Sequence, residues 1–373
     1  MKKIWDKWTR IALVKRIMVG LILGAILGIA VPQATGIAIL GDVFVSALKA
    51  IAPLLVFFLV ISSLCNAGKS HGGVIKTVII LYMFSTVLAA VIAVFASMAF
   101  PVKMTLANAA TDTSAPQGIV EVLNNLLLNV VANPVSSLVN ANYVGILMWA
   151  VLLGLAFRVA DKMTKKVLAD VADGISMVVT WIINLAPVGI FGLVFNTVST
   201  NGLDIFTTYG KLLILLVGCM LFIYFVTNPL LVYWCIRQNP YPLIFHCLKR
   251  SALTAFFTRS SAANIPVNMK VCEEMGLDRD TYSVTIPLGA TINMDGAAIT
   301  ITVMTMATAF TLGIHVDIPT AIILSLLAAL SACGASGVAG GSLLLIPMAC
   351  SLFGISDDIS MQVVAVGFII GVV

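Results

Sequence analysis

The chain has 373 residues, of which 60% are hydrophobic and only 10% are charged, and its formal net charge at pH 7 is +5. Soluble domains carry about 25% charged residues, so this composition excludes an ordinary soluble domain and predicts a polytopic, all-α membrane protein. The seven cysteines form no CxxC pair and the basic residues are scattered, so we expect no disulfide framework, no zinc site, no cofactor and no nucleic-acid partner.

Apolar segments follow one another along the chain with short loops between them. They lie near residues 11–31, 38–66, 74–100, 118–157, 167–197, 211–236, 241–270, 282–310, 318–350 and 359–373. The first follows a basic start without an A-x-A cleavage site, so we expect a retained helix with a cytoplasmic amino end. Asn133-Pro134 predicts that 118–157 breaks into shorter pieces. No low-complexity linker separates the segments, so residues 1–373 are interpreted as one membrane domain.

The positions of lysine and arginine favour one topology. If 241–270 and 318–350 each enter and leave the membrane on one side, the predicted outside loops hold only Lys103 and Lys211. The other loop cations then face the cytoplasm, as the positive-inside rule requires. Counting both segments as full spans disturbs this asymmetry after Arg237, so the re-entrant version is preferred.

The sequence pattern of both segments predicts a break between two half-helices. Residues 258–266 read TRSSAANIP, and residues 331–342 read SACGASGVAGGS, with Pro347 soon after. Irregular backbone at membrane depth survives where it is buried or lines a cavity, and two broken segments, each followed by a helix, suggest an inverted repeat with a site between its halves. The alternative is that Gly, Ala and Ser simply allow close helix packing.

Asn293-Met294-Asp295-Gly296 places a carboxylate and a helix-breaking glycine between Tyr282 and Phe310, a run with no other acidic residue. A carboxylate at bilayer depth costs a few kcal/mol and is rarely left without a partner. The pattern therefore predicts an ion or substrate site. An ion channel could also place such residues there, but two hairpins around one acidic residue suit alternating access better. An enzyme is not expected, because HExxH and GxSxG are missing from the sequence and the apolar run around the NMDG motif has no second carboxylate.

Three motifs carry a resemblance to a known family. TRSSAANIPVNM (258–269), IPLGATINMDGAAI (286–299) and GASGVAGG (334–341) are similar to the dicarboxylate/amino acid:cation symporter family, which includes the glutamate transporters. The RSSAANIP form of the first hairpin is similar to that of the family's bacterial sodium-coupled serine/threonine symporters. The resemblance implies a homotrimer in the inner membrane, with eight transmembrane helices and two re-entrant hairpins per chain. It also implies an elevator-type mechanism, in which a scaffold (about 11–66 and 118–197) holds a moving unit (about 74–100 and 205–373).

The same resemblance implies sodium as the coupling ion and a set of oxygen ligands for it. The ligands fall into three sites. The first uses the third segment and the NMDG run, the second uses backbone carbonyls at and just before that run, and the third is closed by the second hairpin. These residues are Tyr82, Ser85, Thr86, Asn293 and Asp295; Gly289 and Asn293; and Thr291, Ala332, Cys333 and Ala335. Hard cations prefer oxygen ligands, and unwound backbone supplies them without buried charge. Taken alone, Tyr82, Ser85 and Thr86 would be ordinary packing or back-bonding residues.

For the substrate, the resemblance implies contacts from both hairpins and from the NMDG run. The residues are Ser260, Ser261, Met294, Ala297, Val338 and Gly340. Ala297 stands where glutamate transporters have a threonine, and a methyl group cannot donate a hydrogen bond to a carboxylate. We therefore expect sodium-coupled uptake of serine and threonine, with a sodium- or proton-coupled glutamate/aspartate carrier as the alternative.

Two further expectations concern the ends of the predicted bundle. Lys49 is interpreted as a snorkelling or packing residue, and Asp357-Asp358 as the cap of the final helix. The final apolar run stops at Val373 and lacks the acidic and amide residues that the family carries in the second half of this helix. We therefore expect the sequence to be a fragment that would not transport in this form.

Overall fold

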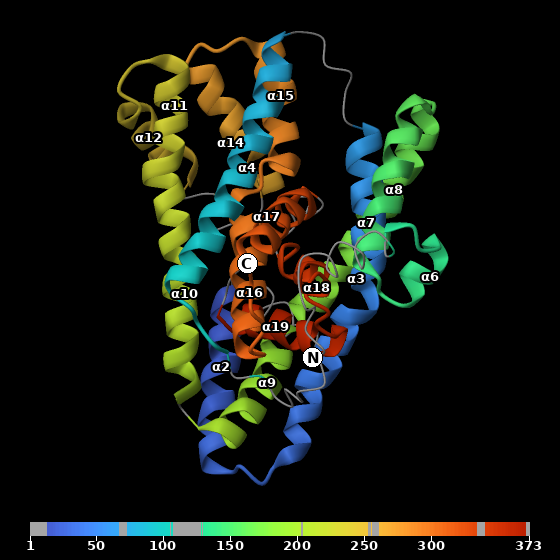
Figure 1. The fold of residues 1–373 in the computed structure, drawn as a ribbon, viewed down its shortest axis with the longest axis vertical. Helices are drawn as coiled ribbons and strands as arrows, with labels where there is room; N and C mark the ends of the chain where they lie inside the picture. Colours follow the sequence, from blue (N-terminus) through green and yellow to red (C-terminus); the bar gives the residue numbers. More distant parts are fainter. Residues whose placement is uncertain are drawn as a thin grey trace, which may run out of the picture.

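The computed structural model describes residues 13–66, 73–104, 106, 128, 130–202, 204–252, 255, 261–333 and 340–370. This part of the chain consists of helices and the connections between them and contains no β-strand. The prediction of an all-α fold is confirmed for the described residues. Figure 1 shows an elongated molecule whose last helices, in orange and red, lie at its centre.

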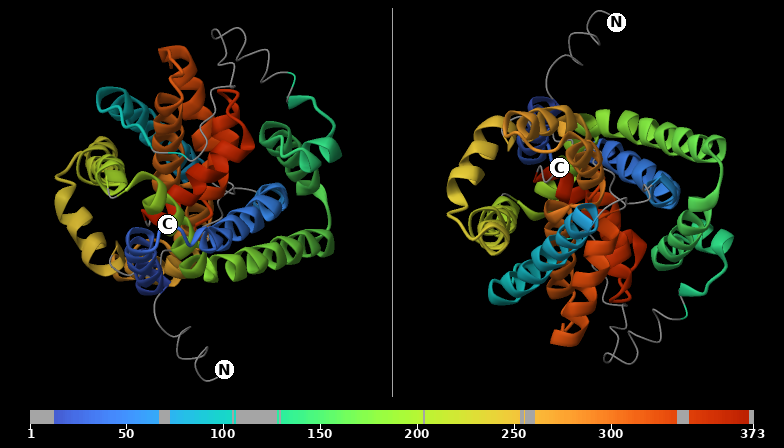
Figure 2. Two further views of the ribbon diagram at one scale, coloured as in Figure 1. Left: turned by 90° about the horizontal axis from the view of Figure 1, so that it is seen from below. Right: turned by 90° about the horizontal axis from the view of Figure 1, so that it is seen from above.

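One group of helices is formed by α2 (Leu13–Ala30), α3 (Ala38–Asn66), α7 (Tyr143–Ala156), α8 (Lys162–Asn184) and α9 (Ala186–Asn201). Helix α3 packs against α7, α8 and α9, and α2 packs along α9. Helix α8 runs along the outer edge of the molecule, as the views from below and above show (Figure 2). This group contains the described helices of the predicted scaffold.

Glycines set the distance between α2 and α9. Gly20, Gly24 and Gly28 recur every four residues on α2 and therefore share one helix face. A Cβ atom at Gly20 would lie 2.2 Å from the carbonyl oxygen of Pro187, and one at Gly24 would lie 2.6 Å from that of Phe191. No larger residue fits at this separation, so the contact is a close backbone-to-backbone packing of the kind common between membrane helices.

A second group surrounds α16 (Asp295–Thr311), whose residues from Ala298 to Ala309 are all buried. Helices α4 (Gly73–Ala99), α10 (Asp204–Phe222) and α17 (Ile318–Ala332) pack around it. The short α18 (Ile346–Ser351) and the last helix, α19 (Asp357–Ile369), complete this group. Helix α19 also contacts α3 and α9, so it joins the two groups. Because α16 is buried on all sides it has no charged face, and its polar residues are threonines such as Thr300 and Thr308, whose hydroxyls bond the carbonyls of Gly296 and Met304 within the helix.

The segment predicted as one run, 167–197, is two helices. Helix α8 ends at Asn184 and α9 begins at Ala186, with Leu185 between them. Pro187 lies in the first turn of α9, where the backbone N–H groups have no carbonyl partner within the helix, so its missing N–H group costs no hydrogen bond. Inside one continuous helix the same proline would remove a backbone hydrogen bond. The proline is the physical reason for the correction.

The NMDG run also interrupts its segment, but not at the glycine. Helix α15 (Arg279–Ile292) ends before Asn293, and α16 begins at Asp295. Gly296 is the second residue of α16, so its interpretation as the helix breaker is wrong. The break falls at Asn293 and Met294, whose backbone angles are non-helical (φ −99° and ψ 81°, φ −119° and ψ 52°).

The first predicted hairpin has two described arms. One is α12 (Tyr241–Cys247), extended by a π-helical turn (Leu248–Ala252), and the other is α14 (Ser261–Glu274). The two arms are joined through Ser251, whose hydroxyl accepts a bond of 2.7 Å from Asn264 Nδ2 and donates to Asn268 Oδ1. Of the predicted break, 258–266, residues 258–260 lie outside the described residues, whereas Ser261 to Pro266 form the start of α14, so the prediction that the break extends to Pro266 is wrong.

A second π-helical turn (Ile223–Thr227) joins α10 to α11 (Asn228–Ile236) and faces the first hairpin. Tyr224 donates to the carbonyl of Ile244 at 3.3 Å, and Tyr241 donates to the carbonyl of Phe225 at 3.2 Å. The two bonds run in opposite directions between the same two segments. They fix the first arm of the hairpin to the preceding helix.

The second predicted hairpin has α17 as its first arm and a 3-10 turn (Leu343–Leu345) with α18 as its second. The arms contact each other, and the Ser331 hydroxyl lies 3.6 Å from the sulfur of Met348. Residues 334–339, which include most of the glycine-rich motif, lie outside the described residues. The contact between the arms is consistent with a hairpin.

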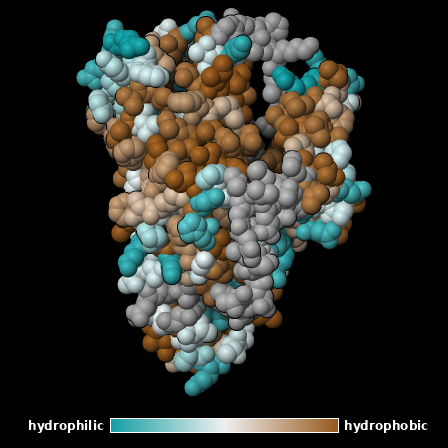
Figure 3. Space-filling view, viewed as in Figure 1, coloured by the Kyte–Doolittle hydropathy of each residue, from teal (hydrophilic) through white to brown (hydrophobic). Residues whose placement is uncertain are grey.

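Within the described residues, five helical segments are long and apolar enough to cross a membrane. They are Thr35–Asn66, Lys76–Ala99, Lys162–Asn184, Thr207–Ile236 and Thr281–Thr311, the last of which contains the break between α15 and α16. Shorter apolar helices cover Tyr143–Val159, Ala186–Thr200 and Ile318–Ala332. Apolar residues cover much of the face seen in Figure 3, and hydrophilic residues gather toward its upper corners and its lower tip. The prediction of a membrane protein with several apolar helices is confirmed, whereas the count of eight spans stays a prediction.

Candidate functional site for sodium and substrate

The candidate site is built around the break between α15 and α16. The N–H group of Asn293 donates to the carbonyl of Gly289 at 2.9 Å, which closes α15. Asp295 lies in the first turn of α16, where the positive end of the helix dipole stabilises a carboxylate. The break thus aims an amide and a carboxylate side chain at the same side.

Helix α4 supplies two hydroxyl groups to this place. Ser85 Oγ lies 2.8 Å from Asn293 Oδ1 and 3.2 Å from Asp295 Oδ1. Thr86 Oγ1 lies 3.1 Å from Asp295 Oδ1 and 3.5 Å from Asn293 Oδ1. Both hydroxyls also approach the carbonyl oxygen of Tyr82, at 3.1 and 2.9 Å. We call these five oxygen atoms the oxygen cluster.

The oxygen cluster has fewer protons than acceptors. Ser85 and Thr86 carry one hydroxyl proton each, whereas the Tyr82 carbonyl, the Asn293 side-chain carbonyl and the Asp295 carboxylate can only accept. Two protons cannot serve three neighbouring acceptors at once. Ser85 is 8% exposed and Thr86 is fully buried, so solvent gives limited help. Such a cluster is chemically suited to a hard cation, whose ligands are oxygen atoms.

Asp295 has no basic partner among the residues that the structure describes. The ion pairs there join Lys49 to Asp357 and Asp358, and Arg250 to Glu274. Asp295 is half-buried, and a carboxylate in such a place with hydroxyl contacts alone keeps an uncompensated negative charge. No group of three or more His, Cys, Asp or Glu side chains that could hold a metal occurs in the described part of the chain.

Tyr82 takes part through its backbone rather than its phenol. Its hydroxyl donates to the carbonyl of Thr285 on α15 at 3.3 Å, which directs the ring away from the oxygen cluster. The ring packs against Gly289, where a Cβ atom would lie 2.9 Å from the phenol oxygen. Thr291, another predicted ligand, bonds the carbonyl of Leu288 at 2.8 Å through its hydroxyl.

The end of α17 approaches the break from the second hairpin. Cys333 Sγ lies 3.5 Å from the carbonyl oxygen of Ile292 and 3.9 Å from the sulfur of Met83 on α4. Ala332, the residue before it, is fully buried. Cys333 therefore connects the three elements α4, α15 and α17. Ala335, whose carbonyl was predicted to join this site, lies outside the described residues.

The predicted substrate residues are placed only in part. Met294 and Ala297 are half-buried beside the oxygen cluster, at the break and in the first turn of α16. Ser261 is exposed at the start of α14, and Gly340 has a φ of 78° and packs near Ile183 and Phe368. Among the described contacts, none joins Ser261 or Gly340 to the break between α15 and α16. Ser260 and Val338 lie outside the described residues.

Sequence reasoning missed the carbonyls of Thr285 and Ile292 and the sulfur of Met83. Backbone acceptors leave no signal in a sequence, because every residue has one. Met83 reads as an ordinary lipid-facing or packing residue. The polar residues Ser251, Asn264 and Asn268 were visible in or near the first motif, but only the packed hairpin shows that they bond one another.

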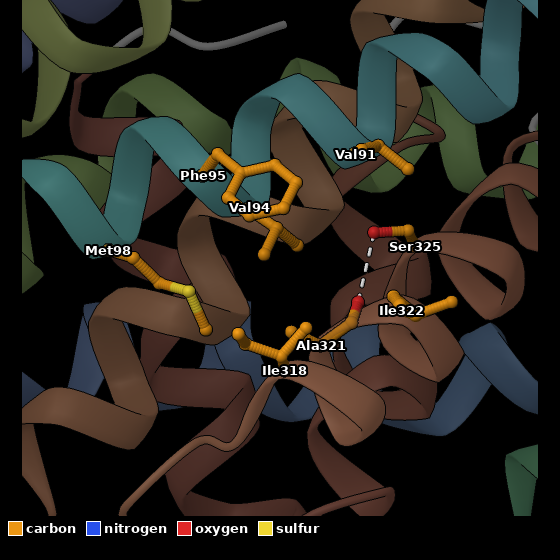
Figure 4. A pocket seen from close by; sticks show the side chains of 8 residues that line it. All are labelled: Val91, Val94, Phe95, Met98, Ile318, Ala321, Ile322 and Ser325. Carbon is orange, nitrogen blue, oxygen red and sulfur yellow. Dashed lines mark hydrogen bonds between the residues drawn. The ribbon is translucent and has the colours of Figure 1, made fainter.

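A small pocket lies between α4 and α17, two to three helical turns away from Ser85 along α4. Figure 4 shows its lining, in which the Ser325 hydroxyl donates to the carbonyl of Ala321 at 2.9 Å. The lining side chains are Val91, Val94, Phe95, Met98, Ile318, Ala321, Ile322 and Ser325. With its hydroxyl already bonded, this wall offers no ligand for an ion or an amino acid, so the pocket is not the candidate site.

A helix break that carries a carboxylate without a basic partner, inside an all-helical bundle with several candidate spans, defines an integral membrane transport protein. Residues 13–373 match the model of the sodium:dicarboxylate symporter family, and the chain belongs to this family. The family consists of transporters, so the expectation that the chain is not an enzyme is confirmed. The resemblance drawn from the three motifs is confirmed as well.

A similar protein is the serine/threonine transporter SstT of Bifidobacterium adolescentis. The two chains are 58% identical over 369 residues, which cover 99% of this chain and 86% of that protein. The similarity therefore extends over the oxygen cluster and over both predicted hairpins, and is not limited to one motif.

Proposed function

We propose that the chain is a secondary active transporter that takes up serine and threonine by symport with sodium. The names of the family and of the similar protein support the two halves of this proposal, sodium coupling and the hydroxyl amino acids. The observation that carries the sodium half is the proton-poor oxygen cluster around Asp295. A sodium ion there would supply the positive charge that Asp295 lacks.

For the remaining sodium sites we propose backbone carbonyls near the break. Those of Gly289, Asn293 and Thr291 lie on α15 and at its end, and those of Ala332 and Cys333 at the end of α17. The contact of Cys333 with the Ile292 carbonyl supports this grouping, because it holds the end of α17 against the break. Ala335 would complete the last of these sites.

The substrate would lie beside the break, between the two hairpins. Ser260 and Ser261 would bind it from the first hairpin, Val338 and Gly340 from the second, and Met294 and Ala297 from the break. Ala297 is half-buried, follows Asp295 by two residues and offers only a methyl group. A buried methyl group cannot satisfy a substrate carboxylate, so serine and threonine fit better than aspartate or glutamate, which remain the second candidate substrates.

We also propose the family's architecture for this chain, with eight spans, two re-entrant hairpins and an elevator-type movement. The described helices support a division into two units. Helices α2, α3, α7, α8 and α9 pack mainly on one another, and α4, α15, α16 and α17 pack mainly on one another. The first set would be the scaffold and the second would carry the site across the membrane.

Helix α8 supports the proposal of a homotrimer in the inner membrane. Its exposed apolar residues lie on the outer edge of the scaffold and include Val167, Met177 and Trp181. Arg158, Lys162, Lys165 and Lys166 cluster at its start. Basic residues at one end favour a cytoplasmic position for that end, which supports the proposal of a cytoplasmic amino terminus.

The decisive experiment is uptake of labelled serine in proteoliposomes, carried out with the purified full-length protein. We expect saturable uptake that requires an inward sodium gradient and is inhibited by threonine but not by aspartate. Inhibition by aspartate with no effect of serine would favour the dicarboxylate carrier. Uptake that rises linearly with concentration and ignores the sodium gradient would instead indicate a channel.

A further inference from the structure

Lys49 forms an ion pair that crosses between the two helix groups. Its Nζ atom lies 2.6 Å from Asp358 Oδ1 and 3.4 Å from Asp357 Oδ2. Lys49 is in the middle of α3, and both aspartates are in the first turn of α19. The expectation that Lys49 only snorkels or packs is therefore wrong.

Both the carboxylates and the lysine of this ion pair have a structural reason to be where they are. The N-cap of α19 is Ser356, and the two aspartates that follow it turn their carboxylates toward α3. Two carboxylates on one helix start repel each other unless a cation lies between them. Lys49 supplies that cation from an apolar span, where a lysine without a partner would cost several kcal/mol.

The pair also joins helices that the proposed mechanism separates. Helix α3 packs with α7, α8 and α9, whereas α19 packs with α18 and α16 of the second group and meets α3 and α9 at the boundary between the groups. If the second group moves along the first, the start of α19 moves past Lys49. An ion pair of this length cannot survive a displacement of more than a few ångströms.

We propose that Lys49 is a positioning residue that clamps the start of α19 in the present conformation and releases it during each transport cycle. The clamp rests on the proposed elevator movement and adds to it a named contact that favours one end state. Because the pair is partly exposed, with 39% of the Lys49 and 84% of the Asp358 side chain accessible, its effect is moderate. We expect its loss to lower the population of the clamped state about two- to fivefold.

The test measures this population directly. Spin labels at Met163 on α8 and Leu330 on α17, both exposed, report the distance between the two groups. The exposed Cys235 is replaced by serine, and labelled protein is diluted with unlabelled protein so that distances within one chain are measured. We expect two distances in the parent protein. Lys49→Met should lower the population of molecules at one of these two distances, and Lys49→Arg should restore that population.

A charge exchange and a matched control separate the clamp from a loss of folding. Lys49→Asp combined with Asp357→Asn and Asp358→Lys should regain at least part of the parent balance. Arg250→Met breaks the ion pair with Glu274, at 3.6 Å, which lies within the first hairpin, and should leave the balance unchanged. In uptake, Lys49→Met should change the maximal rate and leave the KM for serine nearly unaltered, because Lys49 does not touch the site.

Three outcomes would overturn the clamp. Two unchanged populations in Lys49→Met, alongside sodium-dependent serine uptake by the parent, would reject the clamp and leave the proposed function standing. A single distance in the parent under all conditions would reject both the movement and the clamp. Equal effects of Lys49→Met and Arg250→Met would show a general effect of charge removal. Failure of the parent to take up serine would count against the proposed function alone, since the distances need no substrate.

Discussion

Ser85 Oγ on α4 lies 2.8 Å from Asn293 Oδ1 at the end of α15, although the two residues are 208 positions apart in the chain. The same hydroxyl and its neighbour Thr86 reach Asp295 at 3.2 and 3.1 Å. One helix thus supplies two protons to three acceptors, among them the half-buried carboxylate of Asp295. This shortage of protons gives the NMDG break its chemical character and leads to the following predictions.

Replacing Asp295 by asparagine keeps the shape of the side chain and removes its negative charge. Because the charge attracts the cation and a bond to a charged group is worth about 1.5–3 kcal/mol, we expect the sodium concentration for half-maximal uptake to rise about 10- to 100-fold. The measurement is serine uptake against sodium concentration in proteoliposomes. The ranking of serine, threonine and aspartate should stay the same, and a change in that ranking without a sodium effect would contradict the assignment.

Replacing Thr86 by alanine removes one oxygen from the oxygen cluster. We expect a smaller sodium effect, about 2- to 10-fold, as for the loss of one neutral ligand bond of about 0.5–1.5 kcal/mol. Ser97→Ala is the matched control, because Ser97 is buried on the same helix and bonds only the carbonyl of Ala93, at 2.7 Å. Equal sodium curves for the two variants would show that Thr86 is merely a back-bonding residue.

Ala297 is predicted to exclude acidic substrates. Ala297→Thr adds a hydroxyl that can hydrogen-bond a substrate carboxylate, and we expect aspartate to become an inhibitor of serine uptake. Ala297→Val is the control, since valine has nearly the same shape as threonine and no hydroxyl. The comparison is made by competition with unlabelled aspartate. Inhibition in both variants, or in neither, would mean that the hydroxyl does not decide the choice.

The close packing of α2 on α9 makes a prediction about stability. Gly20→Ala would place a Cβ atom 2.2 Å from the Pro187 carbonyl, so the helices must separate. Overpacking of this kind costs about 1–3 kcal/mol, and we expect a lower thermal unfolding temperature in detergent. At Gly218, on α10, a Cβ atom would meet no heavy atom within 4 Å, so Gly218→Ala should be neutral or slightly stabilising. Equal unfolding temperatures for both variants would contradict the packing argument.

Local signals in the sequence predicted much of the fold. Hydropathy placed α2, α3 and α4 within a few residues of their observed bounds, because a helix of about 20 apolar residues is defined by its own composition. It gave the end of α11 correctly but began the α10–α11 segment at 211, whereas α10 begins at Asp204. The same signal failed at Leu185, since an apolar run continues through the junction of α8 and α9 and only Pro187 marks it. In the NMDG run, the glycine predicted a break at Gly296. The break lies instead at Asn293 and Met294, whose backbone is set by the helices on either side.

The candidate site was predictable to a different degree. Asp295 stands out in any reading of the sequence, because it is a single carboxylate in an apolar run. The partners Ser85 and Thr86 came only from the resemblance to a family, since Ser and Thr in a membrane helix usually bond their own backbone. Nothing in the sequence distinguishes the phenol of Tyr82, which faces Thr285, from its carbonyl, which faces the oxygen cluster.

By itself, the sequence determined the class of the protein, its helical segments and the isolated carboxylate, because each of these depends on residues that are neighbours in the chain. Only the tertiary structure decided which oxygens surround Asp295 and how closely α2 approaches α9. It also decided that Lys49 pairs with Asp358, which lies 309 positions away in the chain. The physical reason is that such contacts depend on how whole helices pack. Hydropathy and local propensity carry no information about which helix becomes the neighbour of which.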